Sequence, residues 1–144
     1  KRIDLWWGGL KKNGGLMLTL AYLLRTSLSW RSANVHVKMI VPSEEAAGRA
    51  MPNLEAIVGS MRTGAVPEVL VSDGRPIREV IRESSRDADL VFLGMKDPDS
   101  EYVPYYENLQ ELANDLPTTI FVLASEDLEF QEILIQPEGM PSEK

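Results

Sequence analysis

Short apolar runs alternate along this chain with longer segments in which apolar residues recur at every third or fourth position. The short runs are rich in β-branched and aromatic residues, which is typical of buried strands. They predict five strands, at residues 3–7, 35–41, 68–72, 89–95 and 118–124. The longer segments predict four helices, at residues 16–30, 44–61, from 76 onwards and at 102–116.

Local signals refine the second predicted helix. Ser43 is a typical N-cap, and Glu44 and Glu45 fall in the first turn, where the helix dipole favours negative charge. Pro52 lies inside the same periodic run and is expected to kink or split the helix, because proline removes a backbone donor and clashes with the preceding turn. Gly64 is expected to end the segment.

Strands and helices therefore alternate strictly, with short connections between them. Apolar strands in such an alternation form parallel sheets with helices on both faces. Right-handed crossovers leave few strand orders. We predict an α/β, doubly wound, five-stranded parallel sheet of order 3-2-1-4-5, with its switch point between strands one and four. We expect one domain over residues 1–125 and a tail, 126–144, that could add a strand or act as a docking segment.

The carboxyl ends of the strands next to the switch point are where ligands bind in this class of fold. Seven residues are predicted to line that crevice: Gly8, Gly9, Ile40, Val41, Gly94, Met95 and Lys96. Backbone amides there could approach a phosphate, with Lys11, Lys12 and Lys96 to neutralise it. The glycine spacing in GGLKKNGG matches neither G-x-G-x-x-G nor G-x-x-x-x-G-K-[ST]. The alternative is that these glycines only give a tight exit from the first strand and start the helix.

Aromatic residues mark two further places. Trp6 and Trp7 are neighbours on a predicted strand, so they point to opposite faces of the sheet, and both are expected to be buried under helices. On the fourth helix, Tyr106 is expected to face the core, whereas Tyr105 is expected to be exposed and available to a partner.

A stripe of arginines follows the third strand, with Arg78, Arg82 and Arg86 spaced four residues apart. Glu79 and Glu83 lie beside the stripe, so ion pairing along one solvated helix face is the simplest interpretation. The alternative is that the stripe meets the acidic fourth helix of another subunit.

Composition restricts the chemistry of the chain. It has no cysteine and a single histidine, His36, which excludes disulfides, thiolate metal sites and multi-histidine metal sites. His36 is expected to be partly exposed on its strand. Nothing marks a nucleophile with a neighbouring base. We therefore predict a protein that is not an enzyme, with no catalytic residue, no metal and no cofactor.

Charge is distributed unevenly over the 144 residues, whose net charge is −7. Residues 1–72 carry nine basic and five acidic side chains, whereas residues 73–144 carry six and seventeen. An acidic chain does not bind nucleic acid through its overall field, so no nucleic acid partner is expected. The basic half could be solvated, or could face an anionic membrane surface, an acidic partner or the acidic half of its own chain.

The run IDLWWGGLKKNGGLMLTLAYLL, with the strand VHVKMIV after it, resembles the cytosolic C-terminal domain of the cation-chloride cotransporters. In that family an Ile-Asp-x-Trp-Trp strand leads to a Gly-Gly-Leu helix that ends in Tyr-Leu-Leu. The matching positions are Ile3, Asp4, Trp6, Trp7, Gly14, Gly15, Leu16, Tyr22, Leu23 and Leu24. DADLVFLGM and NDLPTTIFVLA are similar to later strands of the family, so the resemblance spans roughly residues 1–125.

The resemblance implies a fold similar to universal stress proteins. It implies a homodimeric regulatory domain on the cytoplasmic side of the cell membrane, attached to the membrane transport domain of the same polypeptide, which carries sodium or potassium with chloride. The chain begins at Lys1 and is expected to be part of such a longer protein. Two departures stand out: the long phosphorylatable insertion is missing before the third strand, and Gly94 lacks the companion glycines of an ATP-binding loop. The alternative is an ATP-sensing module of the universal-stress-protein type, in which the crevice holds a nucleotide weakly.

Overall fold

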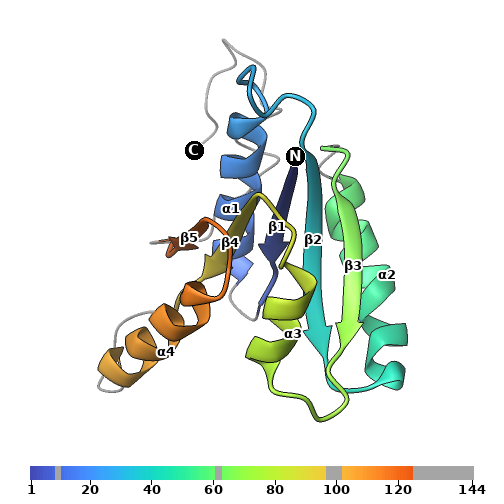
Figure 1. The fold of residues 1–144 in the computed structure, drawn as a ribbon. Coiled ribbons are helices and arrows are strands. Elements are labelled where there is room, and N and C mark those ends of the chain that lie inside the picture. The colour runs from blue at the N-terminus through green and yellow to red at the C-terminus, as the bar shows by residue number, and fades with distance from the viewer. Residues whose placement is uncertain (9–10, 61–62, 97–101, 125–144) are drawn as a thin grey trace, which may run out of the picture.

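A computed structural model describes residues 1–8, 11–60, 63–96 and 102–124. Strands and helices alternate along the chain as the sequence predicts (Figure 1). The elements are β1 (Arg2–Trp6), α1 (Lys11–Leu24), β2 (Asn34–Val41), α2 (Glu44–Ser60), β3 (Val66–Val71), α3 (Ile77–Ser84), β4 (Leu90–Gly94), α4 (Tyr102–Asn114) and β5 (Thr119–Val122). The predicted tail, 126–144, lies outside the described residues.

The five strands form one parallel sheet in the order β3-β2-β1-β4-β5, which confirms the predicted topology. β1 lies in the centre, where Leu5 is paired with Val37 of β2 on one side and with Phe92 of β4 on the other. The order reverses between β1 and β4, so their carboxyl ends form the switch point. This is a doubly wound sheet, consistent with a universal-stress-protein-like fold.

Each face of the sheet carries its own hydrophobic cluster. α1 and α2 cover one face, where Met17 and Leu54 pack with Trp7, and α3 and α4 cover the other, where Ile81 and Leu112 pack with Trp6 (Figure 1). The two tryptophans therefore lie on opposite faces, and both are buried, as predicted. Burial of such large rings supplies a substantial part of the hydrophobic stabilisation of both layers.

Helix α1 begins and ends earlier than predicted. Residues 25–32 form turns instead of the last turns of a helix, and the Gly14-Gly15 pair lies inside α1 instead of in a loop. The reason is packing: a methyl carbon built on Gly14 would lie 2.5 Å from Cη2 and 2.7 Å from Cε3 of Trp7. Glycine lets the helix approach the tryptophan ring, and this contact outweighs the low helix propensity of glycine.

Helix α2 is continuous through Pro52, so the predicted split is wrong. The carbonyl that loses its helical partner belongs to Gly48, which is exposed, so water can satisfy it. The predicted N-cap is confirmed, since the backbone N–H of Ala46 donates to Oγ of Ser43 at 3.2 Å.

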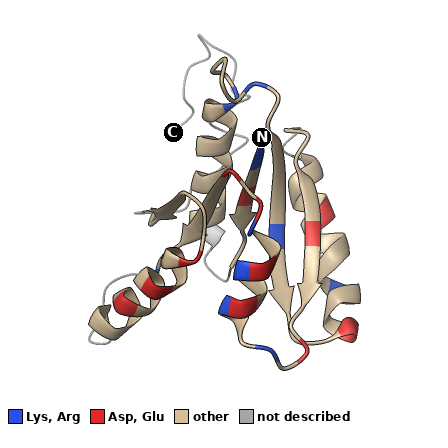
Figure 2. Ribbon diagram, viewed as in Figure 1, with Lys and Arg blue, Asp and Glu red and all other residues tan. Residues whose placement is uncertain are grey.

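The arginine stripe meets the fourth helix of its own chain. Arg78 contacts Glu111 at 3.1 Å and Arg82 contacts Asp115 at 2.7 Å, whereas Arg86 lies beyond the end of α3 (Figure 2). The predicted pairing along one helix face is therefore wrong for these two arginines. The acidic helix of the alternative interpretation is the right partner, but it belongs to the same subunit.

The inner face of α4 differs from the predicted one. Tyr105 is half-buried and lies on the same face as the buried Leu112, seven residues later. Tyr106 is 43% exposed and stacks on Tyr102 with ring centroids 6.0 Å apart. The roles predicted for Tyr105 and Tyr106 are thus exchanged, because the helix is rotated by one residue relative to the face that the apolar spacing indicated.

Candidate functional site: a pocket at the switch point

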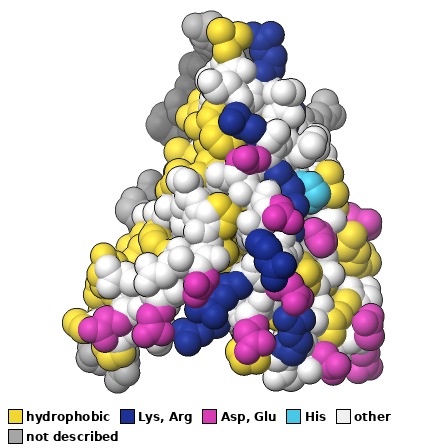
Figure 3. All heavy atoms as spheres, in the orientation of Figure 1, with side chains coloured by type: hydrophobic (Ala, Val, Ile, Leu, Met, Phe, Trp, Pro, Cys, Tyr) yellow, Lys and Arg dark blue, Asp and Glu magenta, His cyan; other side chains and the backbone are white. Residues whose placement is uncertain are grey.

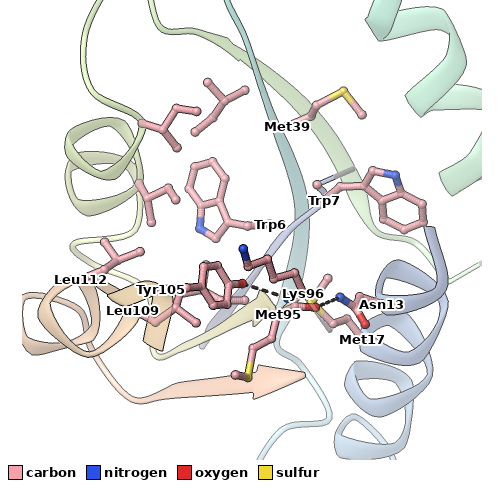
Figure 4. A pocket seen from close by; sticks show the side chains of 16 residues that line it. Trp6, Trp7, Asn13, Met17, Met39, Met95, Lys96, Tyr105, Leu109 and Leu112 are labelled. Atoms are coloured by element: carbon pink, nitrogen blue, oxygen red, sulfur yellow. Dashed lines mark hydrogen bonds between the residues drawn. The ribbon is translucent and has the colours of Figure 1, made fainter. Parts of the chain in front are cut away.

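A cavity of about 690 Å³ opens at the carboxyl ends of β1 and β4. Its walls come from both layers: Trp6 from β1, Met17 from α1, Ile40 from β2, Ile81 from α3 and Leu112 from α4 (Figure 4). This is the position at which doubly wound sheets bind their ligands.

Five of the seven residues predicted for the crevice line this pocket, namely Gly8, Ile40, Gly94, Met95 and Lys96. Val41 does not line it, so this part of the prediction is wrong. Val41 follows Ile40 on β2, so its side chain points to the opposite face of the sheet, where it is buried. Gly9 lies outside the described residues, as do the side chains of Lys11 and Lys12.

Asn13 holds one side of the pocket together. Its side chain is buried, its Nδ2 donates to the carbonyl oxygen of Met95 at 2.7 Å, and its Oδ1 accepts from the backbone N–H of Ala124 at 2.8 Å. Both ends of the amide are therefore engaged, and α1 is joined to the chain after β4 and after β5. A Cβ on Gly94 would lie 3.0 Å from Nδ2 of Asn13, so glycine at this position leaves room for the amide.

Tyr105 closes the opposite side. The backbone N–H of Lys96 donates to Oη of Tyr105 at 2.9 Å, and the Lys96 ammonium lies 4.9 Å from the centre of the tyrosine ring (Figure 4). Lys96 has the only charged side chain among the described residues of the lining. One cation gives little of the multidentate anion binding that a triphosphate needs.

The pocket has few polar side chains, among them Asn13, Lys96 and Tyr105. Its described lining residues include no serine, threonine, histidine, aspartate or glutamate. The described lining therefore contains neither a serine or threonine with a histidine base nor a pair of carboxylates. Within the described parts of the chain, no group of three or more acidic or histidine side chains could hold a metal ion.

A cluster of hydrogen-bonded polar side chains lies under α3. Asp4 is fully buried and accepts hydrogen bonds from both Arg2 nitrogens at 3.1 Å and from Oγ of Ser85 at 2.7 Å. Ser85 in turn accepts a bond from Nε1 of Trp6 at 3.0 Å. Nζ of Lys38 lies 3.4 Å from Asp4 and is almost fully buried. The cluster joins β1 and β2 to the end of α3.

Contacts within this cluster also connect β2 and β3 to the end of α3. Lys38 donates to Oγ of Ser84 at 2.6 Å, which resembles a Ser-Lys pair, but its ammonium also lies 3.5 Å from Glu68 and close to Asp4. The ammonium is thus shared between two carboxylates, from β1 and β3, and a serine hydroxyl at the end of α3. His36 is half-buried, as predicted, with Nδ1 3.8 Å from Glu68.

Sequence reasoning missed the two residues that shape the pocket rim, Asn13 and Tyr105. The signal for Asn13 was present, since it precedes Met17 by one helical turn and so lies on the buried face of α1. It was hidden because the glycines around it favoured a loop.

Neither a scan against protein-family models nor a search of curated proteins finds a match to this sequence. Within the described residues, none of the helices is both long and apolar enough to cross a bilayer. The function therefore has to be inferred from the residues and their arrangement.

Proposed function

We propose that this chain is a non-catalytic regulatory and dimerisation domain of a cation-chloride cotransporter. It lies on the cytoplasmic side of the membrane and relays regulation to the transport domain of the same polypeptide. The observation that carries the proposal is that the residues with the most specific resemblance to that family depend on one another in three dimensions.

These residues form one packing unit between β1 and α1. Ile3 and Asp4 are fully buried, Trp6 donates into the Asp4 cluster through Ser85, and Trp7 lies against Gly14. A tryptophan that needs a glycine seven residues later is a coupled pair and not two independent coincidences. Shared coupled positions support common ancestry better than the same number of scattered matches, because each position constrains the others.

The pocket fits a regulatory domain better than an enzyme. A relay domain needs a stable body, a contact surface and connections to the membrane part, and none of these requires a reacting group. The described lining of the switch-point pocket is mostly apolar and has no carboxylate and no histidine. This arrangement supports binding or structural roles over turnover.

The test uses the parent protein that contains this segment. The upstream sequence is expected to encode about ten to twelve apolar runs of membrane-spanning length. Chloride-dependent rubidium or sodium uptake in cells that express the parent is expected to change in regulation when residues 1–144 are deleted, while ion selectivity is retained. A parent without such runs, or without chloride-dependent flux, would refute the assignment. Light scattering of the 144-residue chain at rising concentration is expected to show a dimer, and a constant monomer mass would refute autonomous dimerisation.

A second candidate is a nucleotide-sensing module, favoured by the convergence of five predicted crevice residues on one pocket. Calorimetric titration with ATP and with adenosine separates the two functions. Nucleotide sensing predicts one ATP site per chain that is weakened in Lys96→Gln and unchanged in the distant control Arg49→Gln. Absence of heat and of any thermal shift with ATP would remove this candidate.

A further inference from the structure

The turn between α1 and β2 forms the end of the molecule opposite the pocket. We call residues 25–32, together with Lys1, the apex. Leu28 is 82% exposed, the most exposed large apolar side chain in the described residues. Trp30 is half-exposed, with the Lys1 ammonium 5.0 Å from its ring centre. Figure 3 shows hydrophobic and basic side chains side by side at this end of the visible face.

The apex lies in a stretch without acidic residues. Residues 5–43 contain five lysines or arginines and no aspartate or glutamate, although the whole chain has 22 acidic residues. Figure 2 shows that the acidic residues lie on the other elements and that the apex turn carries only basic ones. The turn of residues 25–32 is therefore basic, in contrast to the net charge of the protein, whereas the acidic Asp89 lies next to Arg2, where its Oδ2 accepts from the backbone N–H at 2.7 Å.

Two arginines flank the exposed leucine. Arg25 is fixed in place, since Nη1 donates to the carbonyl oxygen of Thr63 at 2.8 Å. Arg31 is exposed on the other side of Leu28. An apolar tip, a tryptophan and a rim of cations correspond to the three zones of an anionic bilayer surface: acyl chains, headgroup boundary and phosphate layer.

We propose that the apex binds the surface of an anionic lipid bilayer. Leu28 enters the acyl boundary, Trp30 lies at the level of the headgroups, and Lys1, Arg25 and Arg31 face lipid phosphates. An acidic protein surface would satisfy the cations but would leave Leu28 without an apolar partner, so the bilayer explains more of the apex. The proposal rests on the proposed function only for its biological setting, in which a membrane part belongs to the same polypeptide. Lys1 lies at this end of the molecule, where its carbonyl oxygen accepts from the backbone N–H of Asn34.

The affinity is expected to be modest and sensitive to salt. Each basic residue at an anionic surface strengthens partitioning by about fivefold, so three give about a hundredfold before the leucine is counted. Screening shortens the reach of these charges to about 8 Å at physiological ionic strength. Such binding suits a domain that is already held near the membrane.

The three tryptophans of the chain provide a local probe. Trp6 and Trp7 are buried, so emission changes on mixing with vesicles report mainly on Trp30. The 144-residue chain is titrated with vesicles of phosphatidylcholine alone and of phosphatidylcholine with 30% phosphatidylserine, each with and without brominated acyl chains. We expect a blue shift and bromine quenching with the anionic vesicles at low salt, and loss of both signals in about 0.5 M salt.

Matched variants separate binding by the apex from the effects of overall charge and of non-specific hydrophobic binding. Arg31→Glu is expected to weaken partitioning by about twentyfold, since one attraction is lost and one repulsion gained. Leu28→Asp is expected to abolish quenching. The controls are Arg49→Glu, which changes the net charge equally on α2, and Val103→Asp, which alters an exposed apolar residue on α4. Both should bind like the original chain, and all four should unfold at nearly the same temperature.

Equal binding to neutral and anionic vesicles, absence of binding, or equal effects of Arg31→Glu and Arg49→Glu would each overturn the proposal. A shift of Trp30 emission caused by polyglutamate in the absence of lipid, together with competition between polyglutamate and vesicles, would also overturn the proposal. That result would assign the apex to an acidic protein. The result is independent of the identity of the parent transporter: vesicle binding tests the apex, whereas chloride-dependent flux tests the proposed function.

Discussion

Replacement of Gly14 by alanine tests the packing between β1 and α1. In an open helix position this change stabilises a protein by about 0.5–1 kcal/mol, because alanine has the higher helix propensity and loses less backbone entropy. At Gly14 the added methyl carbon would meet the ring of Trp7 at distances of 2.5 and 2.7 Å to two of its carbons. Trp7 is buried in the cluster with Met17 and Leu54, so a displaced ring loses packing contacts there.

The clash should outweigh the propensity gain. Overpacking in a closely packed core costs about 1–3 kcal/mol. Subtraction of the gain leaves Gly14→Ala destabilised by about 1 kcal/mol. Gly48→Ala is the matched control, since it lies in exposed helix α2 with nothing within 4 Å of the added carbon. It should be stabilised by up to about 1 kcal/mol, so the two variants are expected to differ in sign.

Urea denaturation followed by far-ultraviolet circular dichroism measures both free energies of unfolding. The melting temperatures should shift by about 4 °C in opposite directions. In the double variant Trp7→Phe with Gly14→Ala, the smaller ring should remove most of the clash, so the two changes should cost less together than the sum of their separate costs. If Gly14→Ala is as stabilising as Gly48→Ala, α1 does not approach β1 as described.

Two further variants test buried polar groups by the same denaturation assay. Asp4→Asn should destabilise the protein by about 3–5 kcal/mol, because it leaves Lys38 buried with only the partly exposed Glu68 as a counter-charge. The control Glu45→Gln, in an exposed pair with Arg49, should change stability by less than about 1 kcal/mol. Equal effects of the two variants would contradict the buried cluster. Asn13→Ala should cost about 2–4 kcal/mol, because the buried backbone groups of Met95 and Ala124 lose their partner, and a near-neutral result would show that the rim is not held by this amide.

The sequence predicts the topology because the signals for it are local. Each strand is a compact apolar run and each helix a periodic one, and their alternation with right-handed crossovers leaves few possible sheets. Ser43 could likewise be identified as an N-cap because it bonds within its own turn, to Ala46. Such features need no knowledge of distant residues.

The wrong predictions concern residues whose conformation depends on contacts with residues far away in the sequence. Gly14 and Gly15 favour a loop locally, and only the ring of Trp7 explains why a helix includes them. Lysine is usually a surface residue, yet Lys38 is buried, because Asp4 and Ser84 from other elements contact its ammonium. Tertiary packing overrides local preference at these positions.

The part of the pocket that strand ends contribute could be predicted from the sequence, because it depends only on the topology. The carboxyl ends of β1 and β4 follow from the strand order, so Gly8, Gly94 and Lys96 could be identified. The walls that helices contribute depend on their rotation about their own axes. A rotation of one residue on α4 exchanged Tyr105 for Tyr106, a change that apolar spacing cannot resolve when both residues are tyrosines.

The position of the family-like residues determines how variants of this chain should be interpreted. Asp4, Trp7 and Gly14 lie in the core, away from the exposed apex, and their contacts hold elements together. Loss of function on changing them therefore reports on the fold and does not by itself identify a ligand or a membrane contact. A functional assignment needs variants such as Arg31→Glu, whose side chain is exposed and whose removal leaves the two hydrophobic clusters intact.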